Sequence, residues 1–458
     1  MKLNLPCTLS VFLLLLFINC SDDDIETPLS DINTFTLTKA DGTAFEPTEF
    51  SFEINSDSIF VTLPPLESKT NLKTKILHNG EHIVPENGSV LDFSNPVQFA
   101  VFNSEGKEKK YTAVVRYARP KNTMFIGAFN RYFALDSQKG TLKWSFSAPA
   151  GSFQYSTAFF NDNVLYVGST DDYLYALNAS NGRLLWKYRT NSSIESSVYV
   201  SDNTVFFGSD DDIFYALNAT TGELKWKYTT GFNVSSSPKV SGEIVYFASD
   251  DGNIYALNKT NGNLKWKYSV GNIFNSSSCA IVENDLYISN RNGSIYKINK
   301  DSGQLIWRSV LGSSGEASSP TISDGYLYTT DRSFLYKINT SNGSIVWQSY
   351  NAGNYSSSAY VNENYVFASS SSGNITVLDK STGNTRWQKT IYSNSAEPIS
   401  VNSTVYTGGG GYNHIYAFNE SDGREIWKYP INSINTSAPV IIDKDGKLHY
   451  PTKSGARD

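Results

Sequence analysis

The chain has 458 residues, of which 40% are apolar, 18% charged and 14% aromatic. This composition supplies enough apolar side chains for a hydrophobic core and too few charges for a disordered chain. The 38 basic and 44 acidic residues give a formal net charge of −6 at pH 7. These values exclude a collagen, a coiled coil, a polytopic membrane protein and a disulfide-rich miniprotein. We expect no nucleic-acid binding, because the chain has no basic block.

The N-terminus has the features of a secretory leader. Lys2 precedes an apolar run from Leu9 to Ile18, which is too short to cross a bilayer as a helix. We therefore expect residues 1–19 to be a signal peptide and residues 20–30 to be an acidic linker. Ordinary secretion with a solvated acidic linker is the plain alternative to lipid attachment.

The segment Leu16-Phe17-Ile18-Asn19-Cys20 resembles the box of bacterial lipoproteins, in which the cysteine is lipidated and becomes the new N-terminus. The acidic run that follows, residues 21–24, resembles the signal that sends lipoproteins of Bacteroidetes to the outside of the outer membrane. These resemblances imply palmitate-type lipidation at Cys20, an outer-membrane anchor and display at the cell surface. The periplasmic face of that membrane is the alternative location.

The chain contains three cysteines, Cys7, Cys20 and Cys279. Removal of the leader leaves one thiol besides the lipidated cysteine, so an intrachain disulfide framework is excluded. Cys279 lies where the other repeats place small or apolar residues, and we expect it to be a buried core residue and not a nucleophile.

Residues 31–118 alternate apolar and polar positions without an internal repeat. Strands are predicted over residues 50–54, 59–63, 97–101 and 111–115. Asn79-Gly80 is a strong signal for a hairpin turn. Turn signals this close together predict an immunoglobulin-like β-sandwich. Residues 92–112 also resemble small sandwich domains near the N-terminus of Bacteroidetes lipoproteins, which are typically spacers or docking modules.

Residues 121–458 repeat with a period of about 40, typical of a β-propeller with several short strands in each blade. A glycine lies four residues before each tryptophan, and an Asn or Asp lies eight residues before it. We expect the Asn or Asp to bond the backbone of its own turn and the glycine to adopt a positive φ. The eight tryptophans are Trp144, Trp186, Trp226, Trp266, Trp307, Trp347, Trp387 and Trp427.

The eight equivalent tryptophans favour a structural role repeated by symmetry. A flat ring near the outer strand of a blade fills the gap to the next blade, so we interpret these residues as structural docking groups. A row of sugar-stacking rings is the functional alternative.

The two ends of the repeat region predict how the propeller closes. Residues 124–127 align with a second strand, residues 437–441 with a first strand, and residues 447–450 with a second strand. We therefore expect the C-terminal segment to complete the first blade. This closure gives eight blades and protects sheet edges that are otherwise exposed.

The run from Ala216 to Trp226 looks like the tryptophan-docking repeat of pyrroloquinoline-quinone (PQQ) propellers, and the runs ending at Trp144 and Trp186 match it. The resemblance implies an all-β, eight-bladed propeller related to quinoprotein dehydrogenases and to the non-catalytic lipoprotein of the outer-membrane barrel assembly machinery. Those dehydrogenases hold the quinone against two adjacent cysteines and carry long insertions that place a calcium ion. The chain has no such cysteine pair and its repeats are evenly spaced, so we expect neither PQQ nor calcium and assign no catalytic residue.

The first strands are expected to converge on a central channel, where seven of the eight units carry a pair of small residues. The pairs are Ser156-Thr157, Ser196-Ser197, Ser236-Ser237, Ser277-Ser278, Ser318-Ser319, Ser357-Ser358 and Ser437-Ala438. The remaining unit is interpreted as Glu397-Pro398. Because a carboxylate in a channel costs free energy unless it is solvated or paired, Glu397 is the candidate for a cation or a polar ligand. A solvated glutamate in a wet channel is the alternative.

Acidic residues recur in equivalent loops, at Asp171-Asp172, Asp210-Asp211-Asp212 and Asp250-Asp251. They are candidates for a cation-binding face, with solvated turn residues as the alternative reading.

Three functional hypotheses follow from the sequence. The first is a non-catalytic, lipid-anchored propeller of the cell envelope that binds a protein or glycan partner on the broad face that loops provide. The second is an enzyme, either quinone-dependent or active on carbohydrates. The third is an assembly factor for outer-membrane proteins.

Overall fold

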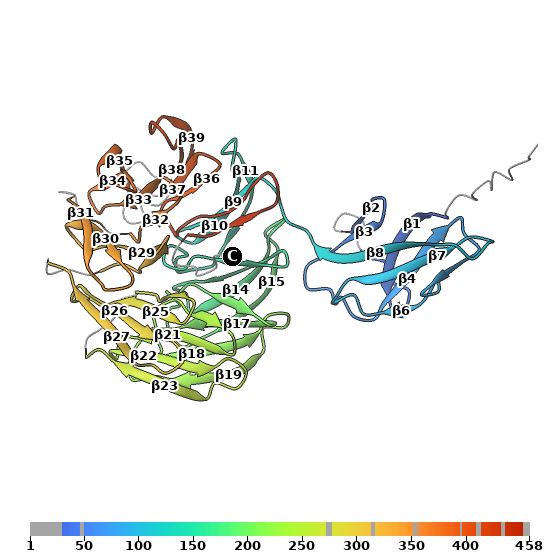
Figure 1. Cartoon of the computed structure of the whole chain (residues 1–458), viewed down its shortest axis with the longest axis horizontal. Coiled ribbons are helices and arrows are strands. Elements are labelled where there is room, and N and C mark those ends of the chain that lie inside the picture. The colour runs from blue at the N-terminus through green and yellow to red at the C-terminus, as the bar shows by residue number, and fades with distance from the viewer. Residues whose placement is uncertain are drawn as a thin grey trace, which may run out of the picture. The chain divides into compact units, whose positions relative to one another are not determined.

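The computed structural model of the protein contains two compact units built of β-strands, which confirms the all-β prediction (Figure 1). One unit holds the described residues up to Val61 and Ser68–Val115, and the other holds Thr62–Glu67 and the described residues from Arg116 onward. The described residues are 30–45, 50–271, 277–312, 317–350, 355, 357–393, 396–408, 414–431 and 436–451. In these ranges no helix is long and apolar enough to cross a membrane. The expected leader and Cys20 lie outside them.

The N-terminal unit is a small sandwich of two sheets, as predicted. Its strands are β1 (Ile32–Lys39), β2 (Ser51–Ile54), β3 (Ser58–Leu63), β4 (Leu72–His78), β5 (His82–Val84), β6 (Val90–Leu91), β7 (Val97–Phe102) and β8 (Glu108–Tyr117). One sheet has the order β1-β4-β6 and the other has the order β2-β3-β8-β7-β5. The ring of Phe35 on β1 lies 5.2 Å from that of Phe99 on β7, so the two sheets bury aromatic side chains between them.

The predicted hairpin turn at Asn79-Gly80 is wrong, because β4 and β5 on either side of it belong to different sheets. β4 pairs with β1 and β6, whereas β5 pairs with β7. The Asn79 side chain accepts a hydrogen bond from the backbone N–H of Asp31. A Cβ at Gly80 would lie 2.5 Å from Val101. The Asn-Gly pair therefore lies where the chain crosses from one sheet to the other, at a point where the backbone packs closely against Val101.

Within the described residues, the second unit contains eight sheets around a central axis, which confirms the predicted eight-bladed propeller (Figure 1). Seven blades have four strands each: β12 (Phe159–Asn161), β13 (Val164–Gly168), β14 (Tyr173–Asn178), β15 (Leu184–Arg189); β16 (Tyr199–Ser201), β17 (Thr204–Gly208), β18 (Ile213–Asn218), β19 (Leu224–Thr229); β20 (Lys239–Ser241), β21 (Ile244–Ser249), β22 (Asn253–Asn258), β23 (Leu264–Ser269); β24 (Ala280–Val282), β25 (Asp285–Ser289), β26 (Ser294–Asn299), β27 (Leu305–Val310); β28 (Thr321–Ser323), β29 (Tyr326–Thr330), β30 (Phe334–Asn339), β31 (Ile345–Tyr350); β32 (Tyr360–Val361), β33 (Tyr365–Ser369), β34 (Gly373–Asp379), β35 (Thr385–Ser393); and β36 (Ile399–Val401), β37 (Thr404–Gly408), β38 (His414–Asn419), β39 (Glu425–Pro430). The first strands contact one another from blade to blade, from β12 to β32, and so line the axis.

The middle strands of each blade are buried on both faces. β17 is buried at every position and β18 at its four central positions, whereas the fourth strand, β19, alternates between exposed and half-buried residues. Strands that pack between two neighbouring blades need apolar residues on both faces, which explains the nearly continuous apolar runs of β17 and β18. The core therefore forms a ring of packed blades around the axis.

The eighth blade joins the two ends of the repeat region. It contains β9 (Thr123–Ala128), β10 (Arg131–Asp136), β11 (Leu142–Ser147), β40 (Val440–Ile442) and β41 (Leu448–His449), in the order β11-β10-β9-β40-β41. Val440 lies opposite Phe125, and Ile442 lies opposite Thr123. In Figure 1 the red C-terminal strand lies beside the teal strands of this blade. The predicted closure by the C-terminal segment is confirmed.

The interpretation of residues 447–450 as a second strand is wrong. β9 already occupies one edge of β40, so β41 folds back onto the other edge and becomes a fifth, innermost strand. Tyr450, which follows it, donates a hydrogen bond to the backbone oxygen of Phe160 at 2.8 Å and accepts one from the nitrogen of Phe160 at 2.9 Å. The C-terminal hairpin therefore fastens the closing blade to the next blade.

The tryptophans join each blade to the next. Each indole N–H donates to a backbone carbonyl of the following blade at 2.7–3.3 Å, and Trp427 donates to Ser137 of the closing blade at 3.0 Å. The ring also covers the repeated glycine of that blade, where an added Cβ would lie 2.5–3.0 Å from ring atoms. These glycines have φ between +68° and +75°. The repeated glycine thus supplies both a left-handed turn and a flat surface for the ring.

Candidate functional site

The first strands carry two rings of side chains around the axis. In the ring nearer the start of the strands, the hydroxyls of Ser197, Ser237, Ser278 and Ser319 each accept a hydrogen bond from the backbone N–H of the ring residue in the preceding blade. This chain of bonds, at 2.9–3.0 Å, runs from Thr157 through Ser197, Ser237 and Ser278 to Ser319. We call this set of eight positions the hydroxyl ring. It explains why small hydroxyl residues are repeated here, since they link the blades at their closest approach.

In six blades the first residue of the pair is a serine with a different hydrogen bond. Its hydroxyl accepts a hydrogen bond from the backbone N–H at the end of the second strand of the same blade, as Ser196 does from Gly208 at 2.9 Å. Equivalent bonds of 2.7–3.0 Å occur in blades containing Ser156, Ser236, Ser318, Ser357 and Ser437. The repeated serine hydroxyl therefore provides a hydrogen-bond acceptor for the backbone N–H group at the end of the second strand.

Glu397 belongs to the hydroxyl ring, one register step away from the position interpreted from the sequence. Ile399 pairs with Tyr406 as Lys239 pairs with Tyr246, and Lys239 lies two residues after its ring member. The pair in this blade is therefore Ala396-Glu397, and the assignment Glu397-Pro398 is wrong. Pro398 aligns with Pro238, Pro320 and Pro439, so the prolines are the sequence signal that gives the correct register.

The Glu397 side chain is 2% exposed and lies between the ring positions of Ser358 and Ala438. In the described part of the chain, no hydrogen-bond partner is found for the buried hydroxyls of Ser358, Ser369 and Thr436. Ser358 is the ring neighbour of Glu397, and Ser369 ends the second strand of the preceding blade. Buried hydroxyl groups are ordinarily hydrogen-bonded, so these hydroxyls are candidates to bind a water molecule or another polar group near Glu397.

A second ring lies two residues farther along the first strands. Its members are Phe159, Tyr199, Lys239, Ala280, Thr321, Tyr360, Ile399 and Val440, which occupy the same register position opposite the second strand. Lys239 is the single charged residue among these eight. Its blade, β20–β23, lies four places from the blade of Glu397 in a wheel of eight. Across the positions of these two rings, all of them described, Glu397 is therefore the one acid and Lys239 the one base, and they lie on opposite blades.

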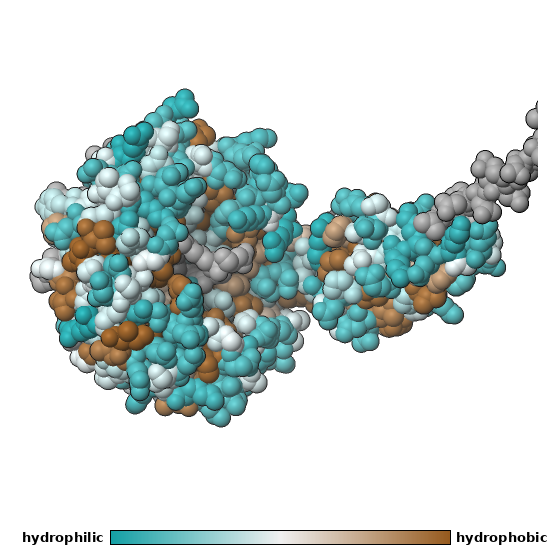
Figure 2. Space-filling view, in the orientation of Figure 1, coloured by the Kyte–Doolittle hydropathy of each residue, from teal (hydrophilic) through white to brown (hydrophobic). Residues whose placement is uncertain are grey.

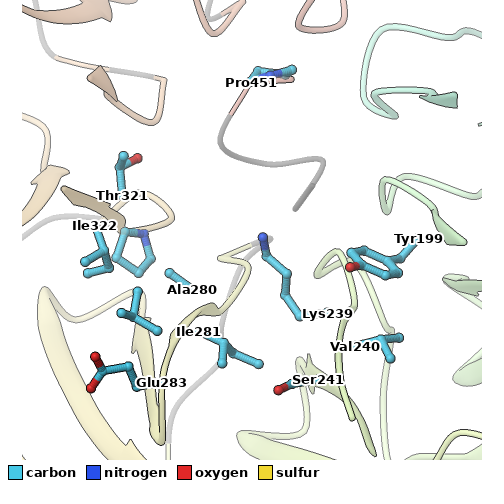
Figure 3. A pocket seen from close by; sticks show the side chains of 12 residues that line it. Tyr199, Lys239, Val240, Ser241, Ala280, Ile281, Glu283, Thr321, Ile322 and Pro451 are labelled. Carbon is cyan, nitrogen blue, oxygen red and sulfur yellow. The ribbon is translucent and has the colours of Figure 1, made fainter. Parts of the chain in front are cut away.

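A cavity of 290 Å³ opens onto the axis beside Lys239. The first strands of four neighbouring blades line it, together with Pro451 from the closing blade. Figure 3 shows the amine of Lys239 directed into this space, near the ring of Tyr199, whereas the carboxylate of Glu283 points away from it. We call this space the axial cavity. The sequence analysis missed it, because a lysine in a strand does not reveal which residues of other blades face it.

Cys279 is 3% exposed, as predicted for a core residue, and burial raises the pKa of its thiol to about 12. A thiol with such a pKa is a poor nucleophile at neutral pH. The other two cysteines are Cys7 and Cys20, so the chain offers no pair of adjacent thiols. These residues therefore do not fit the quinone site that the fold resemblance implies.

Aspartates in the acidic loops accept hydrogen bonds from tyrosines of their own blades. Asp171, Asp211 and Asp251 each accept a hydrogen bond from a tyrosine hydroxyl four residues later, at 2.6–2.7 Å. Among the described residues no group of three or more His, Cys, Asp or Glu side chains has a geometry suited to a metal ion. These repeated aspartates thus have a structural task in the loops between the second and third strands.

We expect Asp210 to make the stability of the fold depend on pH. Its burial, and the negative charges of Glu195, Asp250, Asp211 and Asp212 around it, raise the pKa of its carboxyl group to about 7. A raised carboxyl pKa means that the folded state binds the proton more tightly than the unfolded state, so stability falls as pH rises from about 4 to about 7. We expect Asp210→Asn to be more stable than the wild type at pH 8 and equally stable at pH 4, as measured by urea unfolding. Equal stabilities at pH 8 would contradict this assignment.

Two family models match parts of the chain. The family model described as outer membrane protein assembly factor BamB matches residues 128–284 and 271–439, which is more than half of the chain. A second model, described as SGBP, N-terminal, matches residues 33–115. No curated protein matches the chain.

Solved structures share the propeller fold. BamB from Moraxella catarrhalis is 18% identical with a TM-score of 0.54, over 62% of this chain and 87% of that one. The designed protein Ika8 is 18% identical with a TM-score of 0.56, over 63% and 91% of the two chains. The quinohemoprotein alcohol dehydrogenase ADHIIG from Pseudomonas putida HK5 is 16% identical with a TM-score of 0.54, over 70% and 71%. These likenesses concern the fold, and the matched repeats show that the chain belongs to the family of outer membrane protein assembly factor BamB, built on PQQ-like repeats.

Proposed function

We propose that the protein is a lipid-anchored binding protein of the outer membrane, displayed at the cell surface. Its propeller holds a glycan or protein partner and catalyses no reaction. The observation that carries this proposal is the combination of two matched modules in one chain, a BamB-type propeller and an SGBP N-terminal domain, each in its own compact unit. A rigid wheel with an open axial cavity and a separate small domain is suited to binding.

Lipid attachment at Cys20 has a direct test. We expect Cys20→Ser to abolish incorporation of labelled palmitate and to move the protein from the membrane fraction to the soluble fraction, since a lipid chain contributes about 0.8 kcal/mol of membrane affinity for each buried CH₂ group. Cys279→Ser is the matched control and should leave both readouts unchanged. A Cys20→Ser protein that stays labelled and membrane-bound would overturn the anchor assignment.

Surface display and partner binding are tested on whole cells. Protease added outside the cells should cleave the wild-type protein, and the purified full chain should be retarded in gels that contain a polysaccharide it binds or should capture a membrane partner from its own cells. Protection from protease would overturn surface display. Oxidation of an alcohol by the purified chain with added PQQ and calcium would overturn the non-catalytic proposal.

A second candidate function, assembly of outer-membrane proteins, has one structural observation in its favour. The outer strands β27 and β31 expose apolar residues, and Figure 2 shows brown patches over this part of the propeller. The exposed side chains include Ile306 at 49%, Val310 at 59%, Val346 at 50% and Tyr350 at 66%. An exposed apolar patch on an edge strand is suited to a protein partner. Under this alternative, Ile306→Lys with Val346→Lys should lower the level of folded outer-membrane proteins in cells.

A further inference from the structure

The outer strand β31 lacks the charged residues that the other outer strands carry. Of the eight outer strands in the described part of the chain, β31 alone has no charged residue in its sequence. Charged side chains, and lysine above all, are a common device that keeps an edge strand from pairing with another chain. The edge of β31 therefore lacks a protection that the other seven edges have. The charged residues of those seven strands are Lys143; Lys187 and Arg189; Lys225 and Lys227; Lys265 and Lys267; Arg308; Arg386 and Lys389; and Glu425 and Lys428.

The exposed face of β31 carries two apolar side chains with an amide between them. Val346 is 50% exposed and Tyr350 is 66% exposed, and the side chain of Gln348 is exposed between them. Side chains alternate along a strand, so these three residues share one face of the blade. At the equivalent positions of β19, two of the three residues are Lys225 and Lys227. This face of β31 is therefore apolar where other blades are cationic.

The backbone of β31 can accept a further strand. β31 is the edge strand of the sheet β28-β29-β30-β31 and pairs with β30 on one side. On the other side of an edge strand, the backbone N–H and C=O groups can pair with a strand of another chain. A partner strand at this edge also meets the exposed side chains of β31, which decide the strands that fit.

The side chains of β31 are complementary to those of a second β31. When two copies of one strand pair antiparallel about a two-fold axis, residues equally far before and after the central residue lie opposite each other. With Gln348 at the centre, Val346 lies opposite Tyr350 of the second copy. A pair of one β-branched and one aromatic residue stabilises a sheet, and two glutamine amides can donate to each other.

The same arrangement is unfavourable for the charged edges. In β27 it places Arg308 opposite Arg308 of the second copy, and in β19 and β23 it does the same with Lys227 and Lys267. Like charges directly opposite each other destabilise a strand pair. Charge complementarity therefore favours the edge of β31 over these three edges for self-association.

We propose that two copies of the chain associate through β31, antiparallel about Gln348, so that their two four-stranded sheets form one continuous sheet across a two-fold axis. This inference goes beyond the proposed function and does not depend on it, because the occupant of the edge is a second copy and not a glycan or another protein.

The test exchanges charges at the residue that faces its own copy. Sedimentation velocity over a concentration series should show a dimer of the purified full chain, carrying Cys20→Ser so that no lipid contributes to association. Gln348→Lys and Gln348→Glu, each alone, should weaken the dimer at least about tenfold, because like charges then face each other. An equimolar mixture of these two variants should restore a dimer that contains one copy of each. Gln388→Lys and Gln388→Glu, at the equivalent exposed position of β35, are the matched controls and should change nothing.

Three outcomes would overturn the proposal. They are a full chain that stays monomeric at every concentration, a dimer that Gln348→Lys leaves unchanged, and a mixture of the two charged variants that forms no dimer. A chain that is monomeric when pure but captures another protein through β31 also overturns it and favours the second candidate function. Gln348→Lys should fold, because Lys227 and Lys267 occupy the equivalent positions of β19 and β23. Thermal unfolding of each variant checks this expectation.

Discussion

Replacing Trp144 by alanine should lower the free energy of unfolding by about 3–5 kcal/mol, the range found for buried aromatic residues cut to alanine. The ring is 9% exposed, covers Gly182 of the next blade and donates its N–H to the carbonyl of Ala179 at 2.9 Å. The substitution removes the contact and the hydrogen bond and leaves a gap between two blades. Urea unfolding followed by tryptophan fluorescence and circular dichroism measures the effect.

Two further variants make this prediction specific. Gly182→Ala should also be strongly destabilising, because φ is +74° and the new Cβ would lie 2.5 Å from the Trp144 ring. Leu142→Ala is the control, since Leu142 lies on the same strand and is 46% exposed. If the control costs as much as Trp144→Ala, or if Trp144→Ala costs less than about 1 kcal/mol, the tryptophans do not hold the blades together.

A chain that ends at Thr436 should fail to form the closed wheel. It lacks β40, whose Val440, Ile441 and Ile442 are at most 1% exposed. Burial of three such side chains contributes about 5–9 kcal/mol, at about 1.5–3 kcal/mol each. This loss is as large as the whole stability of many proteins, about 5–15 kcal/mol. It also exposes the edge of β9, so we expect aggregation.

The matched control for this truncation is a chain that ends at Pro451, which keeps β40, β41 and Tyr450. It should keep the oligomeric state of the full chain and melt close to it. Tyr450→Phe provides a milder change: the loss of the hydroxyl group removes both hydrogen bonds to Phe160 and should cost about 1–3 kcal/mol. Size-exclusion chromatography and thermal unfolding distinguish these cases. A chain ending at Thr436 that is folded and soluble, in the oligomeric state of the full chain, would show that the propeller does not need its C-terminal strand.

The propeller was predictable from the sequence because the repeated Asn or Asp and the repeated glycine act within their own turn. Asn218, for example, accepts hydrogen bonds from the backbone of Thr220 and Thr221, as the turn interpretation required. The glycines have the positive φ that their position before tryptophan suggested. Signals of this kind depend on a few consecutive residues and repeat eight times, so the architecture follows from them.

The features that were missed depend on partners far away in the chain. Asn79-Gly80 is locally a hairpin signal, but the sheets on either side decide the pairing. The innermost position of β41 follows from β9 already occupying the other edge of β40. The axial cavity exists only because Lys239 faces side chains from neighbouring blades and Pro451 from the closing blade. Strand pairing and cavity formation are set by tertiary contacts that local patterns do not encode.

The register of Glu397 is an intermediate case. Aligning only the small residues gave Glu397-Pro398, one step from the observed pair, whereas Pro238, Pro320 and Pro439 fix the position of Pro398. With the correct register, Glu397 is the second residue of its pair and not the first. It therefore lies in the hydroxyl ring between neighbouring blades and not at the position that bonds the second strand of its own blade. Its role as a ligand for a cation or polar group remains a proposal, supported by the buried hydroxyl groups beside it.

The most direct test of the closed wheel is a disulfide across the junction of β9 and β40. In a chain with Cys20 and Cys279 replaced by serine, Thr123→Cys and Ile442→Cys place two thiols on paired residues of these strands. Oxidation followed by proteolysis and mass spectrometry should yield one intramolecular link between the peptides that carry residues 123 and 442. Thiols that stay reduced in the folded protein, or that link only between molecules, would contradict the closed eight-bladed wheel.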